Sequence, residues 1–232
     1  MLALWWTKLL DFISPRHCTV CGQRLAATES SLCTTCLLHL PRTQFALSAD
    51  DNPMVQLFWH LTPVGKAAAY FFFQPHSEVA RLIYEMKYHD RPDVGEDLGR
   101  LMAAEMQMAG FFDDIDLLVP VPLSPKRLRQ RGYNQSEQLA RGISQITGLP
   151  VCSGALKRRH FHASQTRLRR LERLDNVDHQ FFLADDRLLA HRHVLLIDDV
   201  CTTGATLRAS ADALAGIEGI RISILTLAFT QH

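Results

Sequence analysis

The sequence lacks a long hydrophobic run and has almost no net charge. Its densest apolar stretch, residues 67–73 (AAAYFFF), is far shorter than the roughly 18 to 20 residues that a membrane-spanning helix needs. Its 25 Lys and Arg nearly balance its 24 Asp and Glu, so the overall charge of +1 indicates neither a nucleic-acid nor a membrane partner. With 47% hydrophobic residues, the chain can still bury a substantial core. We therefore expect a folded cytoplasmic protein with no membrane span.

The apolar N-terminal segment, MLALWWTKLLDFISP, lacks the basic leader and the small-residue cleavage site of a signal peptide. Its apolar residues recur at helical spacing, which predicts an amphipathic helix. Two interpretations stay open: the helix docks on the protein itself, or it binds a membrane surface or a partner. The residues that would form its apolar face are Leu4, Trp5, Leu9 and Phe12.

Cysteine is scarce, yet four of the six cysteines form two CxxC pairs, HCTVCG and LCTTC, separated by eleven residues. Four thiolates can close a tetrahedral coordination sphere, which suits structural zinc and leaves no open position for catalysis. The gap is slightly short for the usual four-cysteine zinc pattern. An iron–sulfur centre, or disulfides in an oxidising compartment, therefore stay open as alternatives. The predicted ligands are Cys18, Cys21, Cys33 and Cys36.

Helical and strand patterns alternate beyond the cysteine pairs, so we expect a small N-terminal module in residues 1–50 and a main domain in residues 51–232. Residues 77–88 predict a helix with Ser77 as its N-cap, and residues 95–109 and 134–148 predict two more. Three further runs, 116–123, 193–200 and 222–229, are rich in Val, Ile and Leu, which is typical of strands covered on both faces. This alternation predicts a parallel α/β sheet, whose ligands bind at the carboxyl ends of the strands.

One predicted strand ends in two acids and a threonine-rich glycine turn, in the stretch VLLIDDVCTTGAT. If residues 200–204 form the loop before a helix that starts at Thr203, its backbone N–H groups can bind phosphate. Asp198 and Asp199 would repel phosphate, so their expected partners are sugar hydroxyls. A sugar phosphate would satisfy both halves of the motif. The alternative is that the aspartates only cap the helix and offset its dipole.

Positive charge is concentrated between Lys126 and Arg173, where twelve Lys or Arg accompany only two acids. Arginine forks there could hold a diphosphate. The charges are more than one diphosphate needs, so with interleaved aromatics they could also bind single-stranded nucleic acid. A solvated cleft loop is the alternative interpretation. The predicted nucleic-acid contacts are Lys126, Arg127, Arg129, Arg131, Tyr133, Arg158, Arg159, Arg167, Arg169 and Arg170.

The stretch LLIDDVCTTGAT resembles the phosphoribosyl pyrophosphate motif of type I phosphoribosyltransferases. The whole chain resembles the ComF/GntX family of competence and DNA-utilisation proteins. In chain order, this second resemblance is carried by the cysteine pairs, EMKYHDRPDVGEDLG, DLLVPVPLSPKRLRQRGYNQSEQLA, SQTRLRRLERLDNV and LLIDDVCTTGATL. It implies a type I phosphoribosyltransferase-like parallel sheet with flanking helices, joined to a small four-cysteine zinc module.

The resemblance also implies roles for individual residues. Asp198 and Asp199 would hold the ribose hydroxyls and are the candidate catalytic pair. Magnesium would bridge the pyrophosphate and the ribose oxygens. The 5′-phosphate would be cradled by Thr202, Thr203, Gly204, Ala205 and Thr206. The pyrophosphate would lie against Val119, Pro120, Val121, Pro122, Leu123 and Ser124, although a proline-bounded loop there could be only a tight turn.

No acceptor for a transfer reaction is indicated. The loop position that carries an aspartate in hypoxanthine-type salvage enzymes is Thr202 here. Our leading hypothesis is a phosphoribosyl pyrophosphate-binding protein that handles single-stranded DNA in DNA uptake or utilisation, beside a competence helicase. Two alternatives stay open: an active phosphoribosyltransferase with an unidentified acceptor, and a non-catalytic sensor that acts on a protein partner.

Overall fold

A four-stranded parallel sheet forms the centre of the computed structural model, which describes residues 15–158, 181–183 and 187–231. Its strand order is β1-β6-β5-β2. The predicted parallel α/β sheet is therefore confirmed. The strand β1, which sequence reasoning did not identify, pairs in parallel with β6 at one side of the sheet. The strands are β1 (Val64–Phe73), β2 (Leu117–Pro120), β5 (His193–Cys201) and β6 (Arg221–Thr230).

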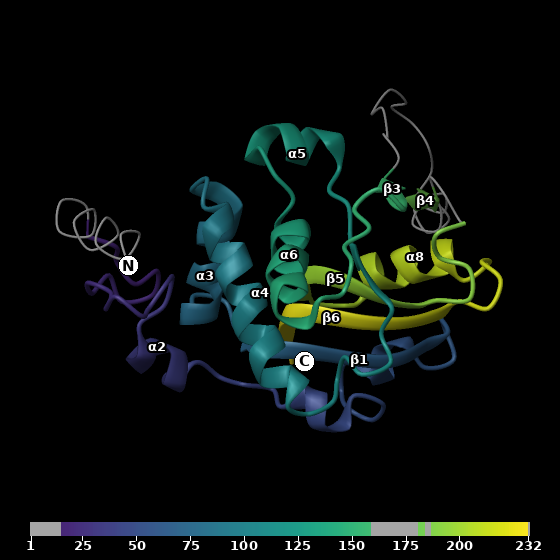
Figure 1. The fold of residues 1–232 in the computed structure, drawn as a ribbon, viewed down its shortest axis with the longest axis horizontal. Helices are drawn as coiled ribbons and strands as arrows, with labels where there is room; N and C mark the ends of the chain where they lie inside the picture. The colour runs from purple at the N-terminus through teal and green to yellow at the C-terminus, as the bar shows by residue number, and fades with distance from the viewer. Residues whose placement is uncertain (1–14, 159–180, 184–186, 232) are drawn as a thin grey trace.

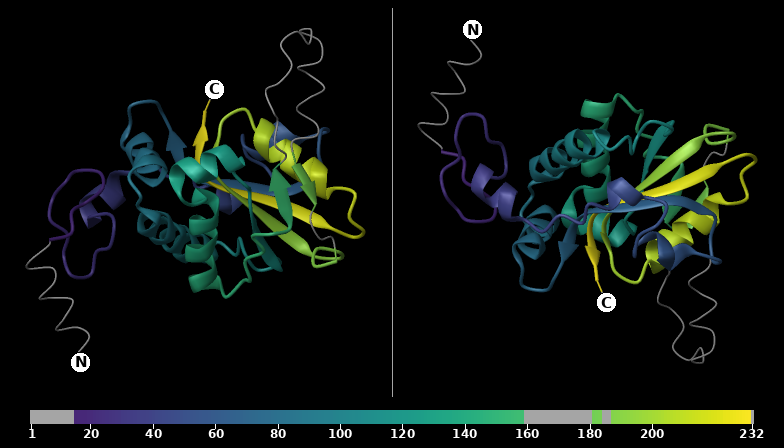
Figure 2. Two further views of the ribbon diagram at one scale, coloured as in Figure 1. Left: turned by 90° about the horizontal axis from the view of Figure 1, so that it is seen from above. Right: turned by 90° about the horizontal axis from the view of Figure 1, so that it is seen from below.

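Helices cover both faces of this sheet (Figures 1 and 2). One face carries α3 (Glu78–Tyr88), α4 (Pro92–Gln107) and α6 (Gln135–Thr147), and the other carries α8 (Ala205–Leu214). Right-handed crossovers place α3 and α4 on the face opposite α8, because the chain crosses the sheet in one direction from β1 to β2 and in the opposite direction from β5 to β6. The central strands are consequently buried on both sides.

The sequence patterns that predicted these elements match their burial. The apolar face of α3 is buried at the four expected positions, and Ser77 caps the helix by accepting a hydrogen bond from the Ala80 N–H. Strand β6 is buried from Ile222 to Phe229. Helices α4 and α6 pack closely because Gly99 and Gly142 lie at their contact, where a Cβ would meet the backbone of the opposite helix. This packing holds α6 over the sheet.

The N-terminal module lies at one end of the molecule, beside α3 and α4 (Figure 2). It contains the short helix α2 (Thr34–His39). The Ser31 hydroxyl donates to the buried Asp97 carboxylate of α4, and the Arg81 guanidinium of α3 donates to the Val20 carbonyl. The module is thus tied to both helices by polar contacts as well as by its buried apolar side chains.

The segment that follows α2 runs along the edge of β1 that is not paired with β6. The Phe72 N–H donates to the Pro41 carbonyl, and the Ala67 N–H donates to the Ala49 carbonyl. Two short 3-10 helices lie in this part of the chain, η1 (Phe45–Ser48) and η2 (Val55–Phe58). A separate antiparallel pair, β3 (Leu156–Arg158) and β4 (Phe181–Leu183), and the helix α5 (Pro125–Arg131) complete the described elements.

Some expectations lie outside the described residues. These are the amphipathic N-terminal helix and the basic residues Arg159, Arg167, Arg169 and Arg170. In the part of the chain that is described, no helix combines the length and the apolar character needed to cross a bilayer.

Candidate functional site

The two acids lie at the carboxyl end of β5, where a parallel sheet binds its ligands. The strand extends to Cys201, and α8 begins at Ala205 rather than at the expected Thr203. The reason is Gly204, whose φ of +74° is left-handed and cannot continue a helix. The connecting loop is therefore residues 202–204, shorter than expected.

This loop lines a small hollow of about 50 Å³ at the N-terminus of α8. Thr202 and Thr203 are exposed, whereas Gly204 is buried, and a Cβ there would lie 3.3 Å from the Phe58 ring of η2. The N-cap of α8 is Gly204, with no side-chain capping bond, so the aspartates do not cap this helix. The first N–H groups of α8 therefore face the hollow without a side-chain acceptor at the cap.

Asp198 is held by two donors on its Oδ1 atom. The Ser136 hydroxyl of α6 donates to it at 2.9 Å, and the Asp199 N–H donates at 2.9 Å. Burial, reinforced by the neighbouring Asp199 charge, raises the pKa of Asp198 to about 7, although both donors and Lys87 oppose the rise. This carboxyl group consequently titrates near neutral pH.

Sequence reasoning missed Lys87, which pairs with the second acid. Its Nζ atom lies 2.6 Å from Asp199 Oδ2, and both side chains are largely buried. The C-terminal end of α3 is held in place because the side chains of Tyr133 and Gln135 both donate to the Met86 carbonyl. The available signal was the lysine in EMKYHDR, directly after the last buried residue of the predicted helix.

The proline-bounded loop after β2 lies beside the same end of the sheet. The Val121 N–H donates to the Ile197 carbonyl at 2.9 Å, directly before Asp198. Strand β2 ends at Pro120, short of the expected residue 123, and Ser124 instead caps α5 by accepting from the Arg127 N–H. A cavity of about 580 Å³ adjoins this loop and is lined by Pro122, Leu123, Pro125, Ser153, Leu156, Lys157, Arg158 and Phe182.

Lys157 and Arg158 of the basic band line this cavity, and α5 begins at Pro125, another lining residue. Burial lowers the pKa of Arg158, the nearby Arg127 charge adds to this, and the Asp198 carboxyl opposes it, so the three charges share one region. Tyr133 is one of the residues expected to contact nucleic acid. Its hydroxyl donates to the Met86 carbonyl, and its ring is half-buried. Helix α5 presents exposed Lys126, Arg127 and Arg129, and half-buried Arg131.

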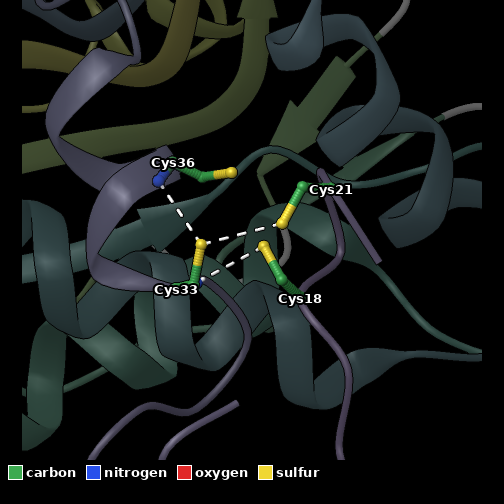
Figure 3. A group of neighbouring side chains, drawn as sticks. All are labelled: Cys18, Cys21, Cys33 and Cys36. Atoms are coloured by element: carbon green, nitrogen blue, oxygen red, sulfur yellow. Dashed lines mark hydrogen bonds between the residues drawn. The ribbon is translucent and has the colours of Figure 1, made fainter. Parts of the chain in front are cut away.

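The four module cysteines converge on one point, as Figure 3 shows, with their sulfur atoms within 4.8 Å of one another. All four are free thiols, and the 3.7 Å between the Sγ atoms of Cys21 and Cys33 is too long for a disulfide. Burial favours the neutral thiol of Cys18, but backbone N–H donors including that of Cys33 lower its pKa to about 7. Four converging sulfur donors fit a tetrahedral metal ion.

The sheet, the acidic pair and the threonine–glycine loop define the class of this protein as a phosphoribosyltransferase-type domain. A family model described as "Phosphoribosyl transferase domain" matches residues 109–232, more than half of the chain. This match covers β2, the basic helix α5 and the acidic motif of β5.

Curated relatives narrow the class. The DNA utilization protein YhgH of Escherichia coli O157:H7 is 29% identical over 200 residues, which cover 85% of this chain and 83% of the relative. Competence protein F of Haemophilus influenzae is 31% identical over 147 residues, covering 61% and 64%. A solved structure of "the allosteric regulatory enzyme of purine biosynthesis" aligns with 60% of this chain and 29% of its own at 22% identity, with a TM-score of 0.40. The chain belongs to the phosphoribosyl transferase domain family and, within it, to the ComF family of competence and DNA-utilisation proteins.

Proposed function

We propose that the protein binds phosphoribosyl pyrophosphate at the carboxyl ends of β2 and β5. The observation that carries this proposal is the acidic pair beside a glycine-containing loop that leads into the N-terminus of α8. The 5′-phosphate accepts hydrogen bonds from the N–H groups and hydroxyls of residues 202–206. The ribose hydroxyls donate to the carboxylates of Asp198 and Asp199. The pyrophosphate lies toward the loop of residues 119–124, near the positive charge of Arg158.

Magnesium suits this arrangement because carboxylate and phosphate oxygens are the hard ligands that it prefers. Asp198 and Asp199 are the described residues that would face it, and it would neutralise charge on the pyrophosphate when bound. Lys87 holds Asp199 in place from α3. In the N-terminal module we propose zinc, whose tetrahedral preference fits Cys18, Cys21, Cys33 and Cys36. Thiolate ligation also fits the reducing cytoplasm, where we place the protein.

We further propose that the protein handles single-stranded DNA while the ligand is bound, next to a competence helicase. Support comes from helix α5, which carries four basic residues and no acidic one, beside the cleft. Polyanion binding of this kind depends strongly on salt, because each contact releases counterions. The names of the relatives, a DNA utilization protein and a competence protein, agree with such a partner.

Calorimetric titration of the metal-loaded protein with magnesium and phosphoribosyl pyrophosphate tests the shared first step. We expect saturable binding that is lost in D198N/D199N. The matched control is D50N/D51N, which removes an exposed aspartate pair and should bind as the wild type does. A folded wild-type protein that does not bind would overturn the proposal.

Two further measurements on the same preparation distinguish DNA binding from phosphoribosyl transfer. Single-stranded oligothymidylate should bind with an affinity that falls steeply with salt, and R129A/R131A should reduce both the affinity and the salt slope. Salt-insensitive binding would contradict the role of α5. Release of pyrophosphate that disappears in Asp199→Asn would instead identify an active transferase.

A further inference from the structure

Helix α3 exposes two tyrosines on the face opposite its buried residues. Tyr84 and Tyr88 are one helical turn apart, 54% and 61% exposed, with ring centroids 4.8 Å apart. The His89 ring lies 5.3 Å from Tyr84. Among the Phe, Tyr and Trp residues in the described part of the chain, only Trp59 and Phe182 are also exposed. The two tyrosine ring planes are tilted by 42° rather than stacked on each other, so exposed aromatic surface stays available to a planar ligand.

Positively charged side chains of α5 lie next to these rings. The Arg131 guanidinium lies over the Tyr88 ring, 5.4 Å from its centroid, and donates to Gln135 Oε1, which holds it in place. The remaining basic residues of α5 continue from Arg131 toward Ser124 and the cleft. Acids lie on the other side: Asp93 pairs with Arg91, Glu85 Oε1 is 3.9 Å from His89 Nε2, and Asp90 is exposed. Aromatic faces beside a row of cations match the bases and the phosphates of a nucleic acid.

We propose that Tyr84 and Tyr88, together with α5, form a base-stacking platform for single-stranded nucleic acid. This inference rests on the proposed function and specifies the surface that the DNA would contact. Lys87, between the two rings in sequence, pairs with Asp199 in the cleft, so the platform is adjacent to the ligand site. Bases stack on the exposed rings, while the phosphates follow α5. The Tyr133 hydroxyl donates a hydrogen bond to the Met86 carbonyl and so stabilises the C-terminal end of α3.

Binding of two labelled 20-mers to the full-length metal-loaded protein tests the platform. One is oligothymidylate and the other is an abasic strand with the same number of phosphates. We expect Y84A/Y88A to weaken oligothymidylate binding by roughly tenfold or more and to leave abasic binding unchanged, because only bases stack. The matched control is Y84F/Y88F, which keeps both rings and should bind both strands as the wild type does.

Crosslinking gives a second, independent readout. Iodouracil placed within the oligonucleotide should crosslink under light to Tyr84 or Tyr88, identified by mass spectrometry of the wild-type complex. Wild-type binding of oligothymidylate that Y84A/Y88A retains in full would overturn the platform alone, and would leave these rings to a protein partner. Wild-type protein that binds neither strand would overturn the proposed DNA function and the platform with it.

Discussion

Lys87 and Asp199 form an ion pair between α3 and the carboxyl end of β5, with 2.6 Å between Nζ and Oδ2. The side chains are 21% and 15% exposed, so water screens the pair only weakly. Asp199 also adjoins the Asp198 carboxyl, and two acids side by side require a positive charge nearby. The lysine therefore stabilises the acidic pair and fixes the position of Asp199.

Replacing Lys87 with Met should lower the free energy of unfolding by about 1 to 3 kcal/mol at pH 8, because Asp199 loses its charged partner in a poorly hydrated position. Denaturant unfolding measures the change. K87M/D199N should recover most of the loss, since residue 199 then carries no unpaired carboxylate, and Lys87→Arg should lose less than Lys87→Met. Equal destabilisation in K87M and K87M/D199N would contradict a direct coupling.

The pH dependence of stability should change in Asp198→Asn. Burial raises the pKa of Asp198 to about 7 from an ordinary value of 3.8, so the folded state binds the proton more tightly than the unfolded chain does. The resulting penalty is absent below pH 3.8, grows as pH rises, and is complete above pH 7. Asparagine removes it, and we expect Tm to rise by about 3 °C or more at pH 8 and to change little at pH 4. Thermal melts from pH 4 to pH 8 measure this.

The same substitution should abolish ligand binding, because asparagine cannot supply the ionised acceptor that ribose hydroxyls favour. Wild-type affinity for phosphoribosyl pyrophosphate should therefore rise as pH increases through about 7. Calorimetry at fixed free magnesium measures this rise.

An Asp198→Asn protein that is less stable than the wild type at pH 8 would contradict the stability prediction, because it would show that the Asp198 carboxylate is not a cost to the fold.

Much of this arrangement could be predicted from local sequence. Val79, Leu82, Ile83 and Met86 recur at helical spacing, and residues 193–200 form an apolar run, so each pattern identifies its own element. The acids and the threonine–glycine turn come directly after the apolar part of that run. Their place at the end of a parallel strand is then set by the rules of such sheets.

The features that sequence reasoning missed depend on contacts between distant segments. Lys87 belongs to α3, which packs on β1, whereas Asp199 belongs to β5, two strands away in the sheet. The tertiary fold alone brings the two side chains together. Strand β1 was overlooked because AAAYFFF has no alternation, which leaves a buried strand and a buried helix indistinguishable by periodicity. The start of α8 was placed two residues early because the left-handed Gly204 is a property of backbone conformation that composition does not specify.

Gly204→Ala should impair the phosphate loop more than the fold. At φ +74° an alanine is strained by roughly 1 to 2 kcal/mol, and its Cβ would also press on the Phe58 ring. We expect ligand affinity to fall at least tenfold. The control is Gly148→Ala, at the same φ of +74° with open space around it, which should lose stability from the strained φ alone and keep ligand binding. Equal affinities of the two variants would contradict a role for this loop.

Removing the proposed zinc from the N-terminal module should weaken ligand binding at the opposite end of α3. The Arg81 guanidinium donates to the carbonyl of Val20, between Cys18 and Cys21, and Lys87 lies further along the same helix. Because a helix moves as a rigid element, loosening the module shifts the position of the lysine. We expect a zinc-selective chelator, with magnesium in excess, to raise the Kd for phosphoribosyl pyrophosphate about fivefold.

Arg81→Ala separates this coupling from general loss of structure. The variant lacks the bond that joins the module to α3, so its Kd should be nearly the same with and without the chelator. Arg141→Ala, which removes an exposed guanidinium paired with Glu137 on α6, should keep the full chelator effect. If the chelator weakens binding equally in Arg81→Ala and in the wild type, the module acts on the cleft through a contact other than α3, and Asp97 of α4, which accepts from Ser31, becomes the next residue to replace.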